Sequence, residues 1–324
     1  KRGVYKMTKS ILVTQELYPK QLEELKEIAK DYDIVESIED ADKNSVEIIF
    51  GWSDELIPLI ESDESKVKWV QYAYAGVNTL PLKLFAEKNI LLTNGSGIHA
   101  NPVTESTIGL LLGLTRSIVQ SAENQRKRRW KDQWENEETA YELAGKTMLI
   151  VGAGKIGVQL GNVAKAFHMH TIGINRSGRH IENMDEQFTQ KELAEIIHKG
   201  DIVVNILPLT KETHHLYDQS LFSKMKDGVI FINVGRGESV DTSALMKAIN
   251  DGKVRYAGLD VFEEEPLPSD HPLWDYEQVL MTPHIAGRVE SYPKYIFPLF
   301  MKNLKAYLQG KELPENLVKL DKGY

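Results

Sequence analysis

The sequence contains no cysteine among its 324 residues, which excludes disulfide bonds and thiolate catalysis and is typical of cytoplasmic proteins. No apolar run reaches the length of a membrane span, and nothing at the start resembles a signal peptide. Positive charge is in deficit, since 39 Lys and Arg stand against 47 Asp and Glu, and the net charge of −8 argues against general nucleic-acid binding. We therefore expect a cytoplasmic protein that binds neither membranes nor nucleic acid.

A chain of this length has room for two domains of ordinary size, each with its own core. Lys1 to Lys6 precede Met7, so we expect residues 1–6 to be left over from recombinant expression. From Met7 onward, short apolar runs alternate with amphipathic stretches, and this rhythm predicts parallel sheets with helices on both faces. The predicted fold class is therefore α/β.

The positions of the apolar runs predict the individual elements. Strands are expected at residues 10–14, 33–36, 46–50, 67–71, 90–93, 146–151, 170–174, 201–206, 229–233, 255–260 and 278–281, and helices at 20–30, 54–61, 79–87, 158–167, 191–198, 220–226, 243–249 and 295–308.

The longest predicted helix begins beside Asn101 and Pro102, because Asn is a good N-cap and Pro suits the first helical position. The pattern continues from Val103 to about Arg126 and is apolar on several faces in its first half. Such a helix must be buried on several sides, so we expect it to connect two domains or to lie in a subunit interface.

A glycine-rich turn, Gly152-Ala-Gly154-Lys-Ile-Gly157, joins one predicted strand to the next predicted helix. The first glycine permits the tight turn, the second lets the backbone approach a pyrophosphate, and the third lets helix and strand pack closely. The helix N-terminus adds unpaired N–H groups and a positive dipole end. Glycines also mark ordinary turns, but this placement between strand and helix predicts a dinucleotide-binding site.

The residues after the following strand indicate which dinucleotide binds. An acidic residue there would accept hydrogen bonds from the adenosine ribose and repel a 2′-phosphate. The chain has Asn175-Arg-Ser-Gly-Arg179 instead, in which Arg176, Ser177 and Arg179 can donate to a phosphate. A solvated turn with two surface arginines is the alternative. Because the segment follows a dinucleotide fingerprint, we predict NADP(H) rather than NAD(H).

Three candidate catalytic residues, Arg236, Glu265 and His284, follow predicted strands at the ends where open parallel sheets bind ligands. Their types fit the reduction of a 2-oxo acid. An arginine holds the carboxylate and carbonyl oxygens, a histidine donates the proton, and a carboxylate beside that histidine fixes its tautomer and favours its protonated form. Taken alone, each residue could have a purely structural role: Arg236 as a loop arginine, Glu265 as a solvated acid and His284 as the cap of a strand. Three such placements after a cofactor fingerprint favour an active site.

Several separate motifs, spread over nearly the whole chain from Met7, resemble those of the NAD(P)-dependent D-2-hydroxyacid dehydrogenases. They lie at residues 75–78, 152–157, 207–210, 233–237, 259–262 with 265–266, and 283–285. The resemblance implies two Rossmann-like, doubly wound domains with the active site in the cleft between them. A flavodoxin-like substrate domain would comprise residues 7–102 and 289–324, and a dinucleotide-binding domain residues 103–288. The resemblance also implies a homodimer formed through the dinucleotide-binding domain.

The resemblance implies a role for each matching residue. Arg236 would bind the substrate, His284 would be the acid/base, and Glu265 would be its partner. Gly76 and Val77 would offer backbone N–H groups to the substrate carboxylate, and Asp260 would hold the nicotinamide carboxamide. The complete set of expected cofactor contacts is Gly152, Gly154, Lys155, Ile156, Gly157, Asn175, Arg176, Ser177, Arg179, Pro208, Thr210, Val234, Gly235, Asp260, His284 and Gly287.

Differences from relatives narrow the expected substrate. Formate dehydrogenases carry Gln where this chain has Glu265, and phosphoglycerate dehydrogenases usually carry an arginine in a loop where residues 50–54 have none. Asn175-Arg176 resembles the glyoxylate/hydroxypyruvate reductase branch, which prefers NADPH. We therefore expect an oxidoreductase that acts on glyoxylate, hydroxypyruvate or a similar small 2-oxo acid.

Two alternatives stay open. One is a D-lactate-type or phosphoglycerate-type dehydrogenase, and the other is a dinucleotide-sensing binding protein like the corepressors that share this fold. The pairs His168/His170 and His214/His215 could bind a metal ion, but no carboxylate or cysteine lies at a recognisable spacing from either pair. We expect no metal.

Overall fold

The computed structural model describes residues 9–77, 79–130 and 141–321, and the chain forms two compact units. Unit 1 comprises Lys1–Ile98 and Val289–Tyr324, and unit 2 comprises His99–Arg288. The first division therefore falls after Ile98 rather than after Pro102. Residues 1–6, expected to be left over from expression, lie outside the described residues.

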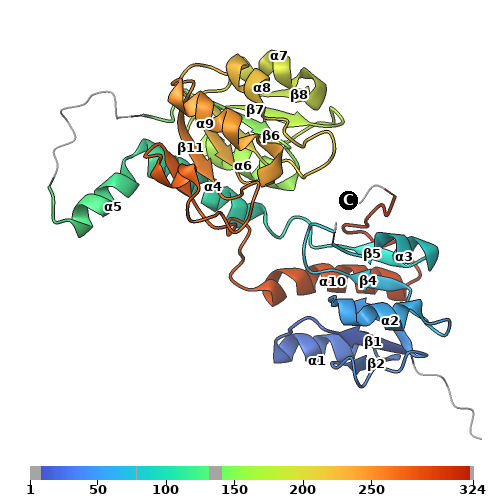
Figure 1. Ribbon diagram of the computed structural model, residues 1–324. Coiled ribbons are helices and arrows are strands. Elements are labelled where there is room, and N and C mark those ends of the chain that lie inside the picture. Colours follow the sequence, from blue (N-terminus) through green and yellow to red (C-terminus); the bar gives the residue numbers. More distant parts are fainter. Residues whose placement is uncertain (1–8, 78, 131–140, 322–324) are drawn as a thin grey trace, which may run out of the picture. The chain divides into compact units, whose positions relative to one another are not determined.

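Unit 1 is built on a five-stranded sheet in the order β2-β1-β3-β4-β5, with every neighbouring pair parallel (Figure 1). The strands are β1 (Lys9–Val13), β2 (Tyr32–Val35), β3 (Val46–Phe50), β4 (Trp69–Gln71) and β5 (Leu91–Thr93). Side chains alternate between the faces of a strand, so Ile11 and Ile48 pack under α1 (Pro19–Ile28) and α10 (Tyr292–Leu308). Leu12 and Ile49 face α2 (Ile57–Glu61) and α3 (Leu82–Glu87). This flavodoxin-like strand order confirms the predicted α/β class for unit 1.

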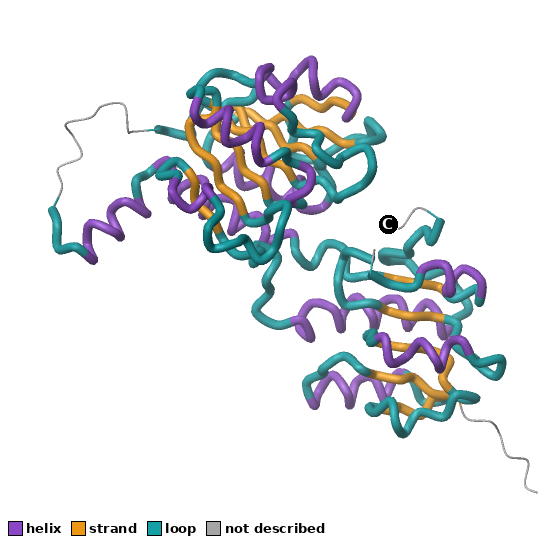
Figure 2. The backbone as a smooth tube through the Cα atoms, in the orientation of Figure 1, coloured by secondary structure: helices purple, strands orange, loops and turns teal. Residues whose placement is uncertain are grey.

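Unit 2 has a seven-stranded parallel sheet in the order β12-β11-β10-β9-β6-β7-β8. Its strands are β6 (Thr147–Val151), β7 (His170–Asn175), β8 (Glu186–Thr189), β9 (Ile202–Asn205), β10 (Val229–Asn233), β11 (Val254–Leu259) and β12 (Val279–Met281). Figure 2 shows helices on both sides of this sheet. The helices α4 (Ala100–Thr115) and α6 (Lys155–Ala166) cover one face, and α7 (Leu193–Ile196), α8 (Gln219–Lys224) and α9 (Thr242–Asn250) cover the other. The sheet is doubly wound, as predicted.

The prediction of one long helix to Arg126 is wrong, because the chain forms two helices, α4, which ends at Thr115, and α5 (Ile118–Arg126). Ser117 adopts a left-handed conformation with φ of 54°, which ends the helical hydrogen-bond ladder. The predicted start is also wrong, since His99 is the N-cap and Asn101 and Pro102 lie inside the first turn. Pro is tolerated there because first-turn N–H groups have no intrahelical partner. The buried helix α4 packs against α6, β10, β11 and β12 within unit 2.

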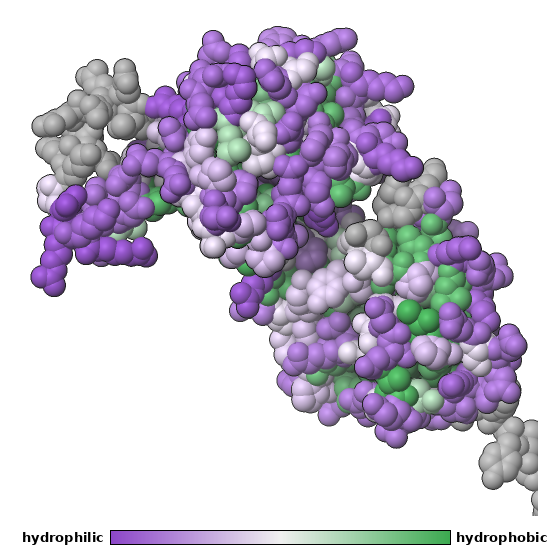
Figure 3. Space-filling view, viewed as in Figure 1, coloured by the Kyte–Doolittle hydropathy of each residue, from purple (hydrophilic) through white to green (hydrophobic). Residues whose placement is uncertain are grey.

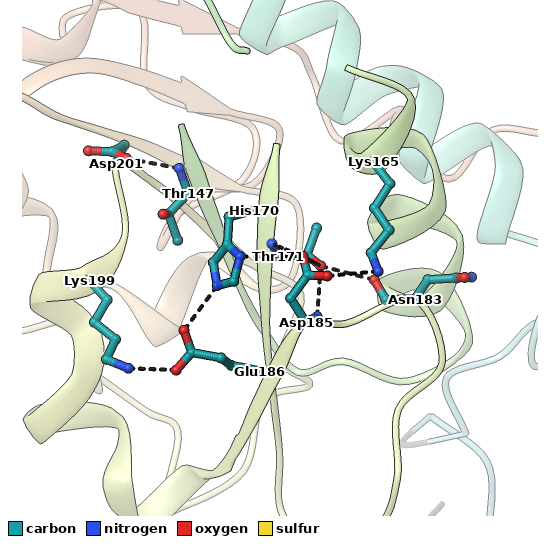
Figure 4. Close-up of polar contacts among 9 residues, drawn as sticks. All are labelled: Thr147, Lys165, His170, Thr171, Asn183, Asp185, Glu186, Lys199 and Asp201. Atoms are coloured by element: carbon teal, nitrogen blue, oxygen red, sulfur yellow. Dashed lines mark hydrogen bonds and ion pairs between the residues drawn. The ribbon is translucent and has the colours of Figure 1, made fainter. Parts of the chain in front are cut away.

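The edge strand β8 is absent from the predicted elements, because its residues Glu-Gln-Phe-Thr form no apolar run. Charged side chains gather beside it (Figure 4). His170 Nε2 lies 2.9 Å from Glu186 Oε1, and its other ring nitrogen lies 3.5 Å from Asp185. Lys199 Nζ lies 2.6 Å from Glu186 Oε2. His170 therefore has carboxylate neighbours that sequence spacing did not indicate. Charged groups along an exposed edge also discourage pairing with another chain.

Replacing Asp185 with asparagine is expected to lower the free energy of unfolding at pH 7 by about 1 kcal/mol, allowing for solvent screening. Burial would raise the pKa of Asp185, but hydrogen bonds from Lys165 and Thr171 hold it at about 2. A depressed pKa stabilises the fold above the unfolded value of about 3.9, and this stability disappears as the pH falls toward 2. Urea unfolding from pH 7 down to pH 3 measures the effect.

The matched control is Asp251→Asn, which removes an exposed ion pair between Lys247 of α9 and the C-cap residue of that helix. We expect that change to alter stability less, since exposed pairs of this kind contribute about 0.3–0.5 kcal/mol. If the free energy of unfolding of Asp185→Asn stays below that of the wild-type protein by the same amount at every pH below 4, the pKa of Asp185 is not the cause.

Within the part of the chain that the structure describes, no helix is long and apolar enough to cross a membrane. In the view of Figure 3, hydrophilic residues cover much of the visible surface.

Candidate active site

The glycine-rich turn lies between β6 and α6, as predicted. Gly152 has φ of +94°, and a Cβ there would lie 2.9 Å from the backbone of Ile206, so only glycine fits the turn. A Cβ at Gly157 would lie 3.0 Å from Ala153 Cβ, which shows how closely the helix packs on the turn. A Cβ at Gly154, by contrast, would meet nothing nearer than 4.0 Å.

Gly154 is also the N-cap of α6 and has no side chain that could cap the helix. The next residues, Lys155 and Ile156, begin α6, so their N–H groups lie at the positive end of the helix dipole. An open turn at the N-terminus of a 12-residue helix fits a pyrophosphate. The residues present therefore fit a bound dinucleotide.

The segment after β7 is a compact turn organised by Asn175. The Asn175 side-chain oxygen accepts hydrogen bonds from the backbone N–H groups of Ser177 and Gly178, at 3.1 and 2.6 Å, and its amide donates to Arg179 O at 2.7 Å. The side chains of Arg176, Ser177 and Arg179 are exposed. Asn175 is buried, so its polar atoms shape the turn that presents the two arginines.

The segment after β9 lies against both the glycine turn and the segment after β10. A Cβ at Gly235 would lie 2.7 Å from Leu207 O, so these backbones touch. Val234 N donates to Asn205 O, and Thr213 Oγ1 donates to Pro208 O at 2.7 Å. Thr210 N in turn donates to Thr213 Oγ1 at 2.7 Å. The predicted cofactor residues Pro208, Thr210, Val234 and Gly235 thus belong to one set of adjoining loops.

The three candidate catalytic residues follow three neighbouring strands. The strand ends are aligned, since Asn233 pairs with Leu259 and Leu259 pairs with Met281. Parallel strands in this register release their loops side by side at one edge of the sheet. A Cβ at Gly237, next to Arg236, would lie 1.8 Å from Phe262 O, so the loops of Arg236 and Glu265 are in backbone contact.

His284 and Glu265 are in direct side-chain contact at this edge. His284 Nδ1 lies 2.6 Å from Glu265 Oε2, and Glu265 Oε1 accepts a hydrogen bond from Phe262 N at 2.9 Å. The carboxylate therefore holds the imidazole by Nδ1 and leaves Nε2 on the other side of the ring. His284 also has φ of +51°, a strained conformation for a residue with a side chain. Strain of this kind is frequent at functional sites.

Asp260 holds the loop that carries His284. Its carboxylate is buried and accepts hydrogen bonds from Thr282 Oγ1 at 2.5 Å and from the N–H groups of Ile285 and Ala286, both at 2.9 Å. Its backbone oxygen accepts from His284 N at 2.8 Å. From the sequence, Asp260 was expected to contact the cofactor. Its hydrogen bonds to the His284 loop were not predicted, because no sequence motif indicates them.

His99 supports the far end of the same loop, because its Nδ1 lies 2.7 Å from Gly287 O. Burial lowers the pKa of His99 below its usual value, although the Gly287 carbonyl opposes this shift. Arg236 is half-buried, and its Nη1 donates to Gly235 O at 2.8 Å. The guanidinium is thus folded back toward its own loop.

Gly76 and Val77 lie in unit 1, in the loop after β4. This loop is fastened to the loop after β5, where Asn94 Nδ2 donates to Ala75 O at 2.7 Å. A Cβ at Gly95 would lie 2.1 Å from Ala73 O, so the two backbones touch. Asn78, the last residue of the motif, lies outside the described residues.

Among the described residues, no group of three or more His, Asp or Glu side chains is arranged to hold a metal ion. His168 and His170 flank the helix–strand junction before β7, and His214 stacks on His215 with 4.2 Å between ring centroids. The carboxylate contacts of His170 and His215 were not visible in the sequence.

Unit 2 has the features of the nucleotide-binding part of an NAD(P)-dependent oxidoreductase. Its parallel sheet has the Rossmann strand order, the glycine turn follows the central strand β6, and the histidine–carboxylate pair lies beyond the carboxyl ends of neighbouring strands.

The chain belongs to the D-isomer specific 2-hydroxyacid dehydrogenase family, whose NAD-binding domain model matches residues 108–286. The Citrobacter koseri "Glyoxylate/hydroxypyruvate reductase B" is 32% identical over 82% of this chain and 83% of its own. The Methanocaldococcus jannaschii "D-3-phosphoglycerate dehydrogenase" is 32% identical over 96% of this chain and 59% of its own. Among solved structures, a family protein from Aeromonas salmonicida has 32% identity and a TM-score of 0.81, over 97% of this chain and 100% of that one. The predicted family is confirmed, and the protein is a 2-hydroxyacid dehydrogenase that uses a nicotinamide dinucleotide.

Proposed function

We propose that the protein reduces glyoxylate, hydroxypyruvate or a similar small 2-oxo acid to the D-2-hydroxy acid, with NADPH as the preferred reductant. The observation that carries this proposal is the His284–Glu265 pair, with 2.6 Å between Nδ1 and Oε2, beside the loop of Arg236. Similarity to a glyoxylate/hydroxypyruvate reductase supports the substrate class.

In this proposal, His284 donates a proton to the carbonyl oxygen of the oxo acid. Because Glu265 binds Nδ1, the proton leaves from Nε2. In the oxidative direction, the neutral imidazole takes the proton back from the hydroxyl group. Asp260 holds the His284 loop through its three hydrogen bonds to residues 282, 285 and 286.

Arg236 binds the substrate in this proposal. Its planar guanidinium matches the carboxylate and the carbonyl oxygen of a 2-oxo acid, so it orients the acid and polarises the carbonyl. The hydrogen bond from Nη1 to Gly235 O fixes one side of the guanidinium and leaves its other donors for the acid.

The nicotinamide dinucleotide supplies the hydride when it is bound. We propose that the glycine turn at residues 152–157 holds its pyrophosphate and that Arg176, Ser177 and Arg179 hold the 2′-phosphate. The residues of the adjoining loops, Pro208, Thr210, Val234, Gly235, Asp260 and Gly287, would line the rest of the dinucleotide site. Among the described residues, the loop at 51–54 after β3 contains no arginine, which argues against a phosphorylated acid.

Initial rates of NADPH consumption with a panel of oxo acids test the substrate class. The panel contains glyoxylate, hydroxypyruvate, pyruvate and phosphohydroxypyruvate. We expect the highest kcat/KM with one of the first two. A clear preference for phosphohydroxypyruvate would assign the protein to the phosphoglycerate branch instead. Tight cofactor binding without turnover of any acid would favour the dinucleotide-sensing alternative.

The cofactor preference is tested with the double variant Arg176→Ala/Arg179→Ala. Charge-assisted hydrogen bonds contribute about 1.5–3 kcal/mol each, so we expect the loss of both arginines to lower kcat/KM for NADPH by about 10²–10⁴-fold. The value for NADH should stay nearly constant, because NADH has no 2′-phosphate. Arg126→Ala, at the end of α5, is the matched control. Equal losses with both cofactors, or a wild-type preference for NADH, would contradict the assignment.

We also propose that the protein forms a homodimer through unit 2. The observation behind this proposal is α5, a nine-residue helix with no buried residue, in which Ile118 is 54% and Val119 38% exposed. Sedimentation of the purified protein should give twice the 36.8 kDa of one chain.

A further inference from the structure

His215 is a residue for which sequence reasoning found no role. It lies in the segment between β9 and α8 and has two polar contacts with different parts of the chain. Its backbone N–H donates to Glu238 O at 2.8 Å. Its Nε2 lies 2.6 Å from Glu263 Oε1. His215 therefore joins two segments that are 25 residues apart, counted from Glu238 to Glu263.

Each of these segments carries a residue of the proposed catalytic centre. Glu238 belongs to the short 3₁₀ turn Gly237–Ser239, for which Arg236 is the N-cap. Glu263 lies two residues before Glu265, whose carboxylate holds His284. The two segments already touch, since a Cβ at Gly237 would lie 1.8 Å from Phe262 O. A shift of either segment would therefore change how Arg236 and His284 lie relative to each other.

The His215–Glu263 pair is better anchored than an ordinary surface pair. The second oxygen of Glu263 accepts a hydrogen bond from Thr242 N at 2.8 Å, at the first residue of α9. Burial would raise the pKa of Glu263, but hydrogen bonds from Thr242 and His215 hold it below its usual value. The side chains of His215 and Glu263 are only 42% and 33% exposed.

The backbone of His215 supports the same conclusion. Its φ is +48°, a conformation that costs free energy for a residue with a Cβ and persists only where surrounding contacts impose it. The ring of His214 stacks on that of His215 with an interplanar angle of 27°, which limits the rotation of the imidazole. The imidazole is therefore held in the orientation that reaches Glu263.

We propose that His215 and Glu263 form a positioning pair that keeps the loops of Arg236 and Glu265 in register for reduction of the oxo acid. Neither residue touches the substrate. The pair acts through Glu265 and Arg236, and this role rests on the proposed function. Misplacement of catalytic groups by about 1 Å can lower turnover by about 10²-fold, so a modest shift is sufficient for a measurable effect.

The test compares His215→Ala, His215→Gln, Glu263→Gln and the double variant His215→Ala/Glu263→Gln with the wild-type protein. The matched control is His170→Ala, because His170 in β7 forms a similar pair with Glu186 in the edge strand β8, with 2.9 Å between the atoms and exposures of 43% and 37%. Thermal unfolding, NADPH affinity, kcat and KM are measured for each variant.

We expect His215→Ala to lower kcat by about tenfold, within the range that misplaced groups cause, while the Kd of NADPH stays unchanged. His215→Gln keeps a donor for Glu263 and should recover most of the activity. The double variant should be no slower than His215→Ala, since both changes break one interaction. His170→Ala should alter thermal stability without altering kcat.

Three results would overturn the positioning role: a kcat of His215→Ala equal to that of His170→Ala, losses that add in the double variant, or no recovery with glutamine. If His215→Ala does not fold, Glu263→Gln and His215→Gln provide the same comparison. An inactive wild-type protein would overturn the proposed function instead. The positioning role would then be tested by NMR, where a change in the ring signals of His284 in Glu263→Gln but not in His170→Ala supports it and unchanged signals overturn it.

Discussion

Replacing His284 with alanine is expected to lower kcat for oxo-acid reduction by about 10²–10⁴-fold, the range that a positioned acid/base contributes. In the proposed function the imidazole of His284 transfers the proton, because Glu265 binds Nδ1 at 2.6 Å and the loop is held by Asp260. Alanine removes the proton donor and leaves the glycine turn intact. Stopped-flow measurement of single turnover separates the chemical step from product release.

The cofactor affinity of the same variant is the internal control for this experiment. The Kd of NADPH, measured by fluorescence titration, should change little, because residues 152–157 and 176–179 remain as they are. His198→Ala, in the 3₁₀ turn Ile197–Lys199, is a matched histidine control and should keep the wild-type kcat. Turnover of His284→Ala within a few-fold of wild type would show that another group supplies the proton.

Replacing Arg236 with lysine is expected to lower kcat/KM for the oxo acid by about 10–100-fold, because a charge-assisted hydrogen bond contributes about 1.5–3 kcal/mol. Lysine keeps the positive charge but cannot form two parallel hydrogen bonds with a carboxylate and its neighbouring carbonyl oxygen. The backbone oxygen of Arg236 accepts hydrogen bonds from Asn233 and Ser239, and these persist in the variant. The loop should therefore keep its shape.

Steady-state kinetics with glyoxylate and hydroxypyruvate measure this loss, which should appear mainly as a higher KM. Arg255→Lys is the matched control, because Arg255 is half-buried near the start of β11 and its guanidinium lies over the rings of Tyr141 and Tyr256. An unchanged KM in Arg236→Lys would exclude Arg236 as the main substrate anchor.

The sequence was sufficient to predict the fold class and which loops to inspect. Parallel strands produce an alternation of apolar runs in the sequence, and the three candidate catalytic residues follow three of those runs. His284 and Glu265 could therefore be paired in advance, although they are 19 positions apart. The register of Asn233, Leu259 and Met281 explains why position along the chain was informative here.

Features that depend on tertiary contacts could not be predicted in the same way. The break at Ser117 arises from a left-handed residue of a type that rarely adopts that conformation, and β8 is a polar edge strand without an apolar run. The contact between His215 and Glu263 joins residues 48 positions apart in two loops, and no periodicity connects them. Asp260 was linked to the cofactor by its motif, while its hydrogen bonds to the His284 loop became visible only in the structure.

A crystal structure of the protein with NADP⁺ and oxalate, an unreactive mimic of the oxo acid, tests the central claim most directly. We predict that one oxalate carboxylate lies on the guanidinium of Arg236 and that His284 Nε2 donates to an oxalate oxygen while Nδ1 stays on Glu265. Oxalate bound away from Arg236, or His284 turned from the ligand toward solvent, would contradict it.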